Sequence, residues 1–391
     1  MLNSLPEEIL TEIFVRLPVK TLLIIRSICK TWNTFITDNP NFTQFHLHSY
    51  KNNSENNLLL SRECNSWKNF MVVRDTNTFT KVSHLDATNY LKVGYVDNIL
   101  KEQVVVPRTY EEIAYLSTDD CNLVGYVDGV LLIHTHNPCV NRGFNRILLW
   151  NPSIRKVFQV PPCNANAQNK TDINFGFGYD QVSNEYKVVA VDMKYCYSKT
   201  RVYRLGTDSW SFAKEKRSYP IIPKLFLKKF SSTTNFEGAI HWLGSDGRRR
   251  KSRYSHLLRF DLTTEAYTCI KLPDVEFKEY RKQPPKRFLS VLDRKLAILD
   301  IGVANVCIWV MENNGTTNGC SWTKQYNVDL RVQKFLYLKE NGELLFYRKF
   351  QELLSYDFRN QQMKKLGRQS QQIIDFVDTY KESLVLLGGY I

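Results

Sequence analysis

The first fifty residues carry a helical pattern of apolar positions. Apolar residues recur three or four positions apart from Ile9 to Leu17, again from Leu22 to Ile28, and again from Cys29 to Ile36. Pro18 separates the first two stretches, because proline cannot donate the helical hydrogen bond and restricts the residue before it. The pattern predicts a small all-α module of three short helices, followed by a stub of a fourth.

This module has more apolar side chains than three short helices can bury, since a unit of about fifty residues has little interior. An apolar surplus on a surface is typical of a partner site. Alternatively, the surplus packs on the rest of the same chain. The pattern alone favours neither explanation.

Beyond residue 57 the period changes from helical to strand-like. The run Lys51–Asn57 is polar, and it predicts a linker over residues 49–57. Five later segments share one design, in which a strand with an aromatic residue is followed by a turn and a returning strand. Their aromatic markers lie roughly 50 residues apart and are Trp150, Tyr203, Phe260, Trp309 and Tyr356.

A second hairpin precedes each of these, so four strands repeat at each step, which is typical of propeller blades of the kelch size class. Apolar stretches remain near both ends, at Leu58–Leu60, Phe70–Val73 and Ile373–Leu387. We expect them to share a sixth blade that closes the ring and removes exposed strand edges. The predicted fold class is therefore α+β and multidomain, with an all-α module (1–48), a linker (49–57) and an all-β propeller of six blades (58–391). An open two-sheet sandwich is the alternative.

Charge and cysteine content add expectations about partners and compartment. The chain has a net charge of +14, and its first fifty residues hold four basic and four acidic groups, so the whole excess lies beyond them. An excess of basic residues beyond residue 50 favours acidic partners, because opposite charges attract over long distances. No run of eighteen apolar residues and no signal-peptide pattern is present, and none of the nine cysteines forms a C-x-x-C pair. We expect no membrane association, and a cytoplasmic or nuclear protein with reduced thiols.

Motifs for catalysis or cofactor binding are missing from the sequence. It contains no H-E-x-x-H, no G-x-S-x-G and no P-loop, and Gly176-Phe177-Gly178 is interpreted as a pair of strand glycines. His134, His136 and Cys139 are close enough to suggest a metal, but no fourth ligand is near. We therefore expect no catalytic residue, no cofactor and no metal.

Candidates for binding a target lie between the predicted strands. The basic run Arg248-Arg249-Arg250-Lys251-x-Arg253 is a nuclear-import signal, a contact for an anionic partner or, as we favour, a solvated loop. Loop aromatics either anchor a target or pack blade against blade. The candidates are Tyr195, Tyr197, Arg248, Arg250 and Tyr254, and the loops to consider are Asn164–Thr171, Tyr195–Lys199, Ser245–Arg253 and Asn313–Gly319.

One set of motifs covers nearly all of residues 4–48. It consists of Leu5-Pro6-x-Glu8-Ile9-Leu10, Ile13, Arg16-Leu17-Pro18-Val19-Lys20-x-Leu22 and Arg26-x-x-Cys29-Lys30-x-Trp32. In order and spacing this set resembles an F-box of the plant type. The resemblance implies docking onto an SKP-type adaptor that bridges to a cullin scaffold. By position, the implied adaptor contacts or their supports are Leu5, Pro6, Ile9, Leu10, Ile13, Leu17, Pro18, Leu22 and Trp32.

The strand-rich part contains a second set of motifs. They are Gly129–Leu132, Trp150-Asn151-Pro152-Ser153, Phe177–Asp180 with Tyr186–Val189, Gly238–Trp242 and Phe260-Asp261-Leu262. In order and spacing they are similar to the plant F-box-associated (type 1) interaction domain, which is often called F-box/kelch-repeat and whose plan S-locus F-box proteins share. Together the resemblances imply the substrate-recognition subunit of an SCF ubiquitin ligase, which recruits a target for ubiquitination and proteasomal degradation. The alternatives are a basic polyanion-binding propeller, which the lack of base-stacking motifs disfavours for nucleic acid, and an adaptor-bound scaffold outside the ligase.

Overall fold

The structure is a computed structural model of the chain. It describes residues 6–39, 41–51, 58–65, 68–75, 81–85, 121–136, 145–163, 173–192, 200–213, 226–227, 233–245, 254–274, 285–313, 320–349, 352–368 and 373–386. The chain divides into two compact units, of which the first comprises Met1–Pro162 with Asp378–Ile391 and the second comprises Cys163–Val377.

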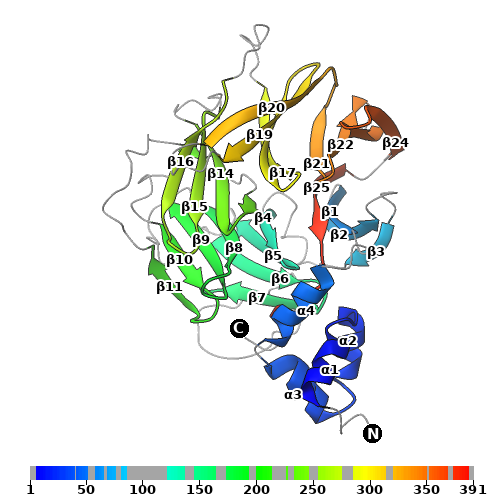
Figure 1. Cartoon of the computed structure of the whole chain (residues 1–391), viewed down its shortest axis with the longest axis vertical. Helices are drawn as coiled ribbons and strands as arrows, with labels where there is room; N and C mark the ends of the chain where they lie inside the picture. Colours follow the sequence, from blue (N-terminus) through cyan, green and yellow to red (C-terminus); the bar gives the residue numbers. More distant parts are fainter. Residues whose placement is uncertain are drawn as a thin grey trace. The chain divides into compact units, whose positions relative to one another are not determined.

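The N-terminal module contains four helices in its described part, rather than the three predicted (Figure 1). They are α1 (Glu7–Phe14), α2 (Val19–Ile25), α3 (Lys30–Asp38) and α4 (Phe42–Lys51). Helices α1 and α2 each begin directly after a proline, at a position where a missing N–H costs no hydrogen bond. The predicted stub is a full helix because Phe42 and Leu47 are buried, and it extends into the segment predicted as a linker.

Five antiparallel sheets are each built from strands that follow one another along the described chain. The first unit holds β4 (Cys121–Val127), β5 (Val130–His136), β6 (Asn145–Asn151) and β7 (Lys156–Val160). The second unit holds the other four sheets, beginning with β8 (Ile173–Asp180), β9 (Glu185–Asp192), β10 (Arg201–Arg204) and β11 (Ser209–Phe212). They continue with β12 (Phe226–Leu227), β13 (Thr234–Phe236), β14 (Ala239–Ser245), β15 (His256–Asp261) and β16 (Tyr267–Lys271); then β17 (Lys286–Leu292), β18 (Lys295–Ile301), β19 (Val306–Asn313) and β20 (Cys320–Val328); then β21 (Lys334–Leu338), β22 (Glu343–Arg348), β23 (Glu352–Asp357) and β24 (Gln362–Arg368).

The five aromatic markers occupy the same place in these sheets, which confirms the hairpin repeat. Each lies in the third strand, namely β6, β10, β15, β19 and β23. The third strand pairs on both sides, so its large side chains meet cross-strand neighbours. Tyr203 pairs with Trp210 at a ring distance of 5.4 Å, and Phe260 pairs with Tyr267 at 4.9 Å.

Tight turns join the first and second strands of several sheets. Asp128 and Gly129 connect β4 to β5 with φ of 47° and 84°, and Asp293 and Arg294 connect β17 to β18 with φ of 48° and 58°. Positive φ at both central residues is the two-residue turn whose twist matches that of the flanking strands. The pair Asp128-Gly129 is a local sequence signal for this type of turn.

A further sheet has the strand order β25-β1-β2-β3 and joins the two ends of the chain. Its strands are β1 (Leu58–Asn65), β2 (Lys68–Asp75), β3 (Lys81–Leu85) and β25 (Ile373–Tyr380). The predicted pairing of the two chain ends is thus present. The prediction of six blades is nevertheless corrected, because five blades, not six, are built from consecutive strands in the described chain.

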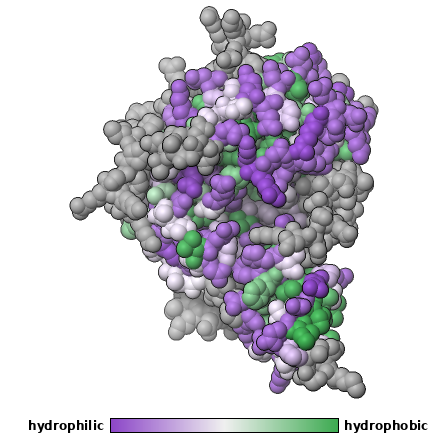
Figure 2. Space-filling view, viewed as in Figure 1, coloured by the Kyte–Doolittle hydropathy of each residue, from purple (hydrophilic) through white to green (hydrophobic). Residues whose placement is uncertain are grey.

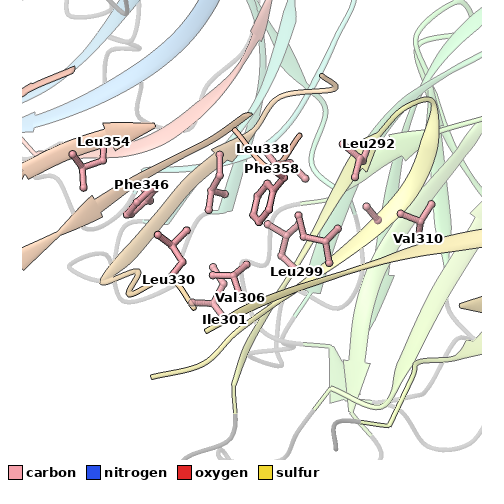
Figure 3. Close-up of a cluster of buried hydrophobic side chains, with 13 residues drawn as sticks. Leu292, Leu299, Ile301, Val306, Val310, Leu330, Leu338, Phe346, Leu354 and Phe358 are labelled. Carbon is pink, nitrogen blue, oxygen red and sulfur yellow. The ribbon is translucent and has the colours of Figure 1, made fainter. Parts of the chain in front are cut away.

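In the second unit each sheet packs on the next one along the chain. One apolar cluster joins Val189 and Val202 to Trp242 and Phe260, and a second joins Leu257 to Ile298. A third cluster joins β17–β20 to β21–β24 through side chains that Figure 3 shows facing one another across the two sheets, among them Leu299, Val306, Phe346 and Phe358. This succession is that of a β-propeller rather than of the two-sheet sandwich.

A buried charge network joins β8–β11 to β14–β16. The ammonium of Lys187 donates to Asp180 Oδ2 at 2.8 Å and to the carbonyl of Leu262 at 2.7 Å, and it lies 3.5 Å from Glu265 Oε1. Glu265 also pairs with Arg204. Burial would raise the pKa of Asp180, but hydrogen bonds from Lys187, Thr263, Ser183 and the backbone of Val182 outweigh it and hold that pKa well below its usual value. The network therefore fixes the two sheets to each other with charged groups.

Candidate adaptor-binding surface

The helical module folds around a small apolar core. The buried members from the module are Leu10, Phe14, Val15, Val19, Leu22, Ile36 and Phe42, which come from all four helices and, for Val15, from the residue after α1. Leu384, near the other end of the chain, is the remaining buried member. Phe14 meets Trp32 and Phe35 edge to face, each at a ring distance of 5.8 Å, and Phe35 meets Phe42 at 5.4 Å. These aromatic contacts connect α1, α3 and α4 in one packed group.

Other apolar side chains of the module are left on its surface. Ile9 and Ile13 lie four residues apart on α1 and are 46% and 43% exposed, while Ile24 and Ile28 are 58% and 63% exposed. We call these four residues the exposed isoleucines. Figure 2 shows apolar residues gathered on the surface of the helical module. Phe45 of α4 is a fifth exposed apolar side chain, at 51%.

The structure sorts the predicted adaptor contacts into three groups. Ile9, Ile13, Pro6 and Pro18 are exposed, Leu17 and Trp32 are half-buried, and Leu10 and Leu22 are buried. Leu5 lies outside the described residues. A buried side chain cannot touch a partner, so Leu10 and Leu22 are supports of the surface, and the exposed residues are its available contacts. The interface itself stays a prediction.

Sequence reasoning did not select Ile24 and Ile28 as contacts. The helices are short and apolar on more than one side, so periodicity alone does not tell which apolar face turns inward. A surplus of isoleucine in α2 and just after it was the available signal.

His46 supports the connection between α1 and α2. Its Nε2 lies 2.9 Å from the carbonyl oxygen of Leu17, at the end of the first helical stretch. Burial lowers the pKa of His46, although the bond to Leu17 opposes this. A neutral His46 that donates from Nε2 fits this contact, and it holds Leu17 and the following Pro18 in place.

The predicted target-binding residues fall mostly outside the described part of the chain. Tyr195, Tyr197, Arg248 and Arg250 are all in this position. Tyr254 is described and half-buried, and it packs against the apolar cluster shared by β14–β16 and β17–β20. Its carbonyl accepts a 2.7 Å bond from Arg287, whose guanidinium also binds Asp300 at 2.7 Å. Tyr254 thus takes part in packing between blades, and its contact with a target stays a prediction.

The four loops predicted to bind a target lie almost entirely outside the described residues. Of Asn164–Thr171, Tyr195–Lys199, Ser245–Arg253 and Asn313–Gly319, the structure describes only Ser245, the last residue of β14, and Asn313, the last residue of β19. Their role in target binding stays a prediction.

Among the described residues, no three potential metal ligands come together, and no helix is long and apolar enough to cross a membrane. His134 is buried on β5, while the side chains of His136 and Cys139 lie outside the description. Gly176 and Gly178 both lie in β8, as predicted for strand glycines. A Cβ on Gly176 would lie 2.7 Å from Trp242, and a Cβ on Gly178 would lie 2.5 Å from Leu262.

Comparisons with known proteins match both parts of the chain. Residues 2–44 match the F-box domain, and residues 87–385 match the F-box associated beta propeller domain. The chain belongs to the F-box-associated β-propeller family. An F-box domain implies binding to an SKP-type adaptor in an SCF complex. Kelch repeats, in contrast, are not shown by these matches.

Similar proteins are found in Arabidopsis thaliana. The chain is 26% identical to "Probable F-box protein At5g47300" over 86% of this chain and 71% of that protein, and 25% identical to "F-box/kelch-repeat protein At3g44120" over 83% and 76%. Among solved structures, the β-propeller domain of Cps50 (Swd1) from Myceliophteria thermophila aligns with a TM-score of 0.40 at 8% identity, over 79% of this chain and 82% of that one. That likeness is too distant to carry an argument.

Proposed function

We propose that this protein is the substrate-recognition subunit of an SCF ubiquitin ligase. The observation that carries the proposal is the set of exposed isoleucines on a module that already has its own aromatic core. Apolar side chains left on such a small module are stabilised when a partner covers them. The match of residues 2–44 to the F-box domain supports an SKP-type adaptor as that partner.

In this role the chain supplies proximity and no catalytic group. The adaptor connects the F-box to a cullin, and the propeller presents a target protein to a ubiquitin-conjugating enzyme held elsewhere on the scaffold. Holding two reactants together raises their effective concentration by orders of magnitude. We further propose a target with an acidic surface, because the whole net charge of +14 lies outside the F-box. Ubiquitination would lead to degradation of the target, and the cytoplasm or nucleus is the proposed compartment.

Co-purification tests the proposal on the full chain. The double variant Ile13→Ser with Ile24→Ser makes two exposed positions polar without opening a cavity in the core. Val182→Ser is the matched control, because Val182 is 79% exposed in the β8–β9 turn of the other unit. We expect the wild type and the control to retain the SKP-type adaptor and the cullin, and the double variant to lose both.

Other outcomes separate the alternatives. A double variant that keeps the adaptor would contradict the assignment of the surface. A wild type that binds the adaptor but no cullin would favour a scaffold acting outside the ligase. Binding to polyanions with a steep salt dependence, and no adaptor, would instead favour a polyanion-binding propeller.

A further inference from the structure

The last described residues of the chain are buried although they have no regular secondary structure. After β25 the chain continues through residues 381–386, which we call the C-terminal segment. Ser383, Leu384, Val385 and Leu386 are between 0% and 3% exposed. An irregular segment of this kind needs partners for its backbone groups, because buried polar groups without hydrogen bonds are costly.

Asn151, the last residue of β6, supplies these partners. Its amide nitrogen donates to the carbonyl of Ser383 at 3.1 Å, to Ser383 Oγ at 3.0 Å and to the carbonyl of Val385 at 2.8 Å. Its side-chain oxygen accepts from the backbone N–H of Ser153 at 2.9 Å. Asn151 is fully buried, and both ends of its amide are used.

Neighbouring residues of the same sheet hold the segment at three more points. The hydroxyl of Tyr126 accepts from the N–H of Lys381 at 2.6 Å and lies 3.2 Å from its carbonyl. Ser153 Oγ accepts from the N–H of Ser383 at 3.3 Å. Gly129 has a φ of 84°, and a Cβ there would lie 2.8 Å from the carbonyl of Lys381. The glycine thus allows the segment to pass close to the β4–β5 turn.

Comparison with equivalent positions shows what the asparagine adds. Asp261 ends β15 and Asp357 ends β23, and each accepts from its own turn, at Thr263 and Arg359, as Asn151 does at Ser153. An aspartate serves that turn equally well, but it cannot donate to carbonyl oxygens. The amide nitrogen of Asn151 is therefore the group that suits this position to the C-terminal segment.

The other side of the segment belongs to the helical module. Leu384 is 0% exposed and is a member of the same apolar cluster as Leu10, Phe14 and Leu22, and Ile154 of the β6–β7 turn packs against that cluster. Burial raises the pKa of Glu382, and the nearby charge of Lys20 on α2 opposes this shift. One short segment thus contacts the β4–β7 sheet and the F-box core together.

We propose that the C-terminal segment is a clip that completes the F-box core with Leu384 and holds the F-box on the β4–β7 sheet through Asn151. Residues at opposite ends of the sequence then form one rigid part. The adaptor-binding surface, and an adaptor bound to it, then keep a fixed orientation to this sheet. This positioning role rests on the proposed function only in its consequence for the ligase.

Hydrogen exchange on the full chain tests the clip. Asn151→Asp keeps the turn acceptor and replaces the donor with an acceptor, and Leu384→Ala removes the side chain from the core. Asp357→Asn is the matched control at an equivalent strand end. We expect each of the first two variants to speed amide exchange in α1–α3 by about tenfold or more, and the control to leave it unchanged. Leu384→Met, which conserves the volume of the side chain, should keep the wild-type protection of α1–α3.

Two results would overturn the proposal. One is faster exchange in residues 381–386 with unchanged protection of α1–α3, since the segment would then be a cover without a coupling role. The other is equal loss of protection in β17–β24, which would show general unfolding. Adaptor affinity supplies the second readout and should fall by about tenfold in Asn151→Asp. If the variants show the expected exchange pattern but the wild type binds no adaptor, the proposed function is contradicted and the clip remains supported.

Discussion

Replacing Lys187 with methionine is expected to destabilise the second unit strongly. Lys187 and Asp180 are 4% and 2% exposed in their side chains, and Glu265 is 0% exposed. Lys187→Met leaves the two carboxylates buried with one cation, Arg204, on Glu265. Removing one partner of a buried ion pair costs roughly 3–5 kcal/mol, because the remaining charge keeps its desolvation penalty without the compensating partner.

The assay is urea unfolding at pH 7, followed by fluorescence and compared with Lys295→Met. Lys295 makes an ion pair of the same 2.8 Å length with Glu312, but the two side chains are 48% and 38% exposed. Solvent screens such a pair, and we expect a loss of about 1 kcal/mol or less. Because both lysines form an ion pair, the difference between the two losses of stability reports the effect of burial.

The pH dependence provides the sharper test. The folded-state pKa of Asp180 is depressed, so its contribution to the free energy of unfolding is present above its unfolded pKa and is lost as the pH falls toward the folded value. Without Lys187 this pKa rises, so less stability remains to be lost in acid. The difference between wild type and Lys187→Met should therefore shrink as the pH falls below about 4. A difference that is small at pH 7, or that grows in acid, would refute the reasoning.

Three further predictions concern packing and protonation. Gly176→Ala should cost about 1–3 kcal/mol in urea unfolding, since its methyl group would meet Trp242, and a cost near zero would count against the close contact. Burial lowers the pKa of His241 to about 4, so the stability that its neutral form contributes above pH 6.5 should be lost as the pH falls from 6.5 to 4. His241→Gln should reduce the slope of stability against pH in this range. An unchanged slope would show that other groups cause it. Leu22→Ala should lower F-box stability by about 2–5 kcal/mol, whereas Ile24→Ala should change stability by less than about 0.5 kcal/mol and weaken adaptor binding; equal stability losses would contradict their assignment to core and surface.

The sequence allowed the blade repeat and the F-box to be predicted because both depend on local patterns. The markers from Trp150 to Tyr356 recur at regular spacing, and each lies in the third strand of its sheet. Pro6 and Pro18 likewise mark helix starts by local chemistry. These features need no knowledge of distant contacts.

The remaining features depend on contacts between residues far apart in the chain. Lys187 lies 78 positions from Glu265, and Asn151 lies 232 positions from Ser383, so no local period signals either contact. The same limit explains why Leu10 could not be told from Ile9 as a buried support. Its burial depends on which side of α1 meets the other helices and Leu384.

Calorimetric titration of the purified full chain with an SKP-type adaptor tests the central claim most directly. Burial of the exposed isoleucines predicts binding with a negative change in heat capacity, and weaker binding by the Ile13→Ser and Ile24→Ser double variant. The Val182→Ser control should bind like the wild type. Absence of binding by the wild type, or binding that does not change in the double variant, would contradict the assignment of this surface to the adaptor.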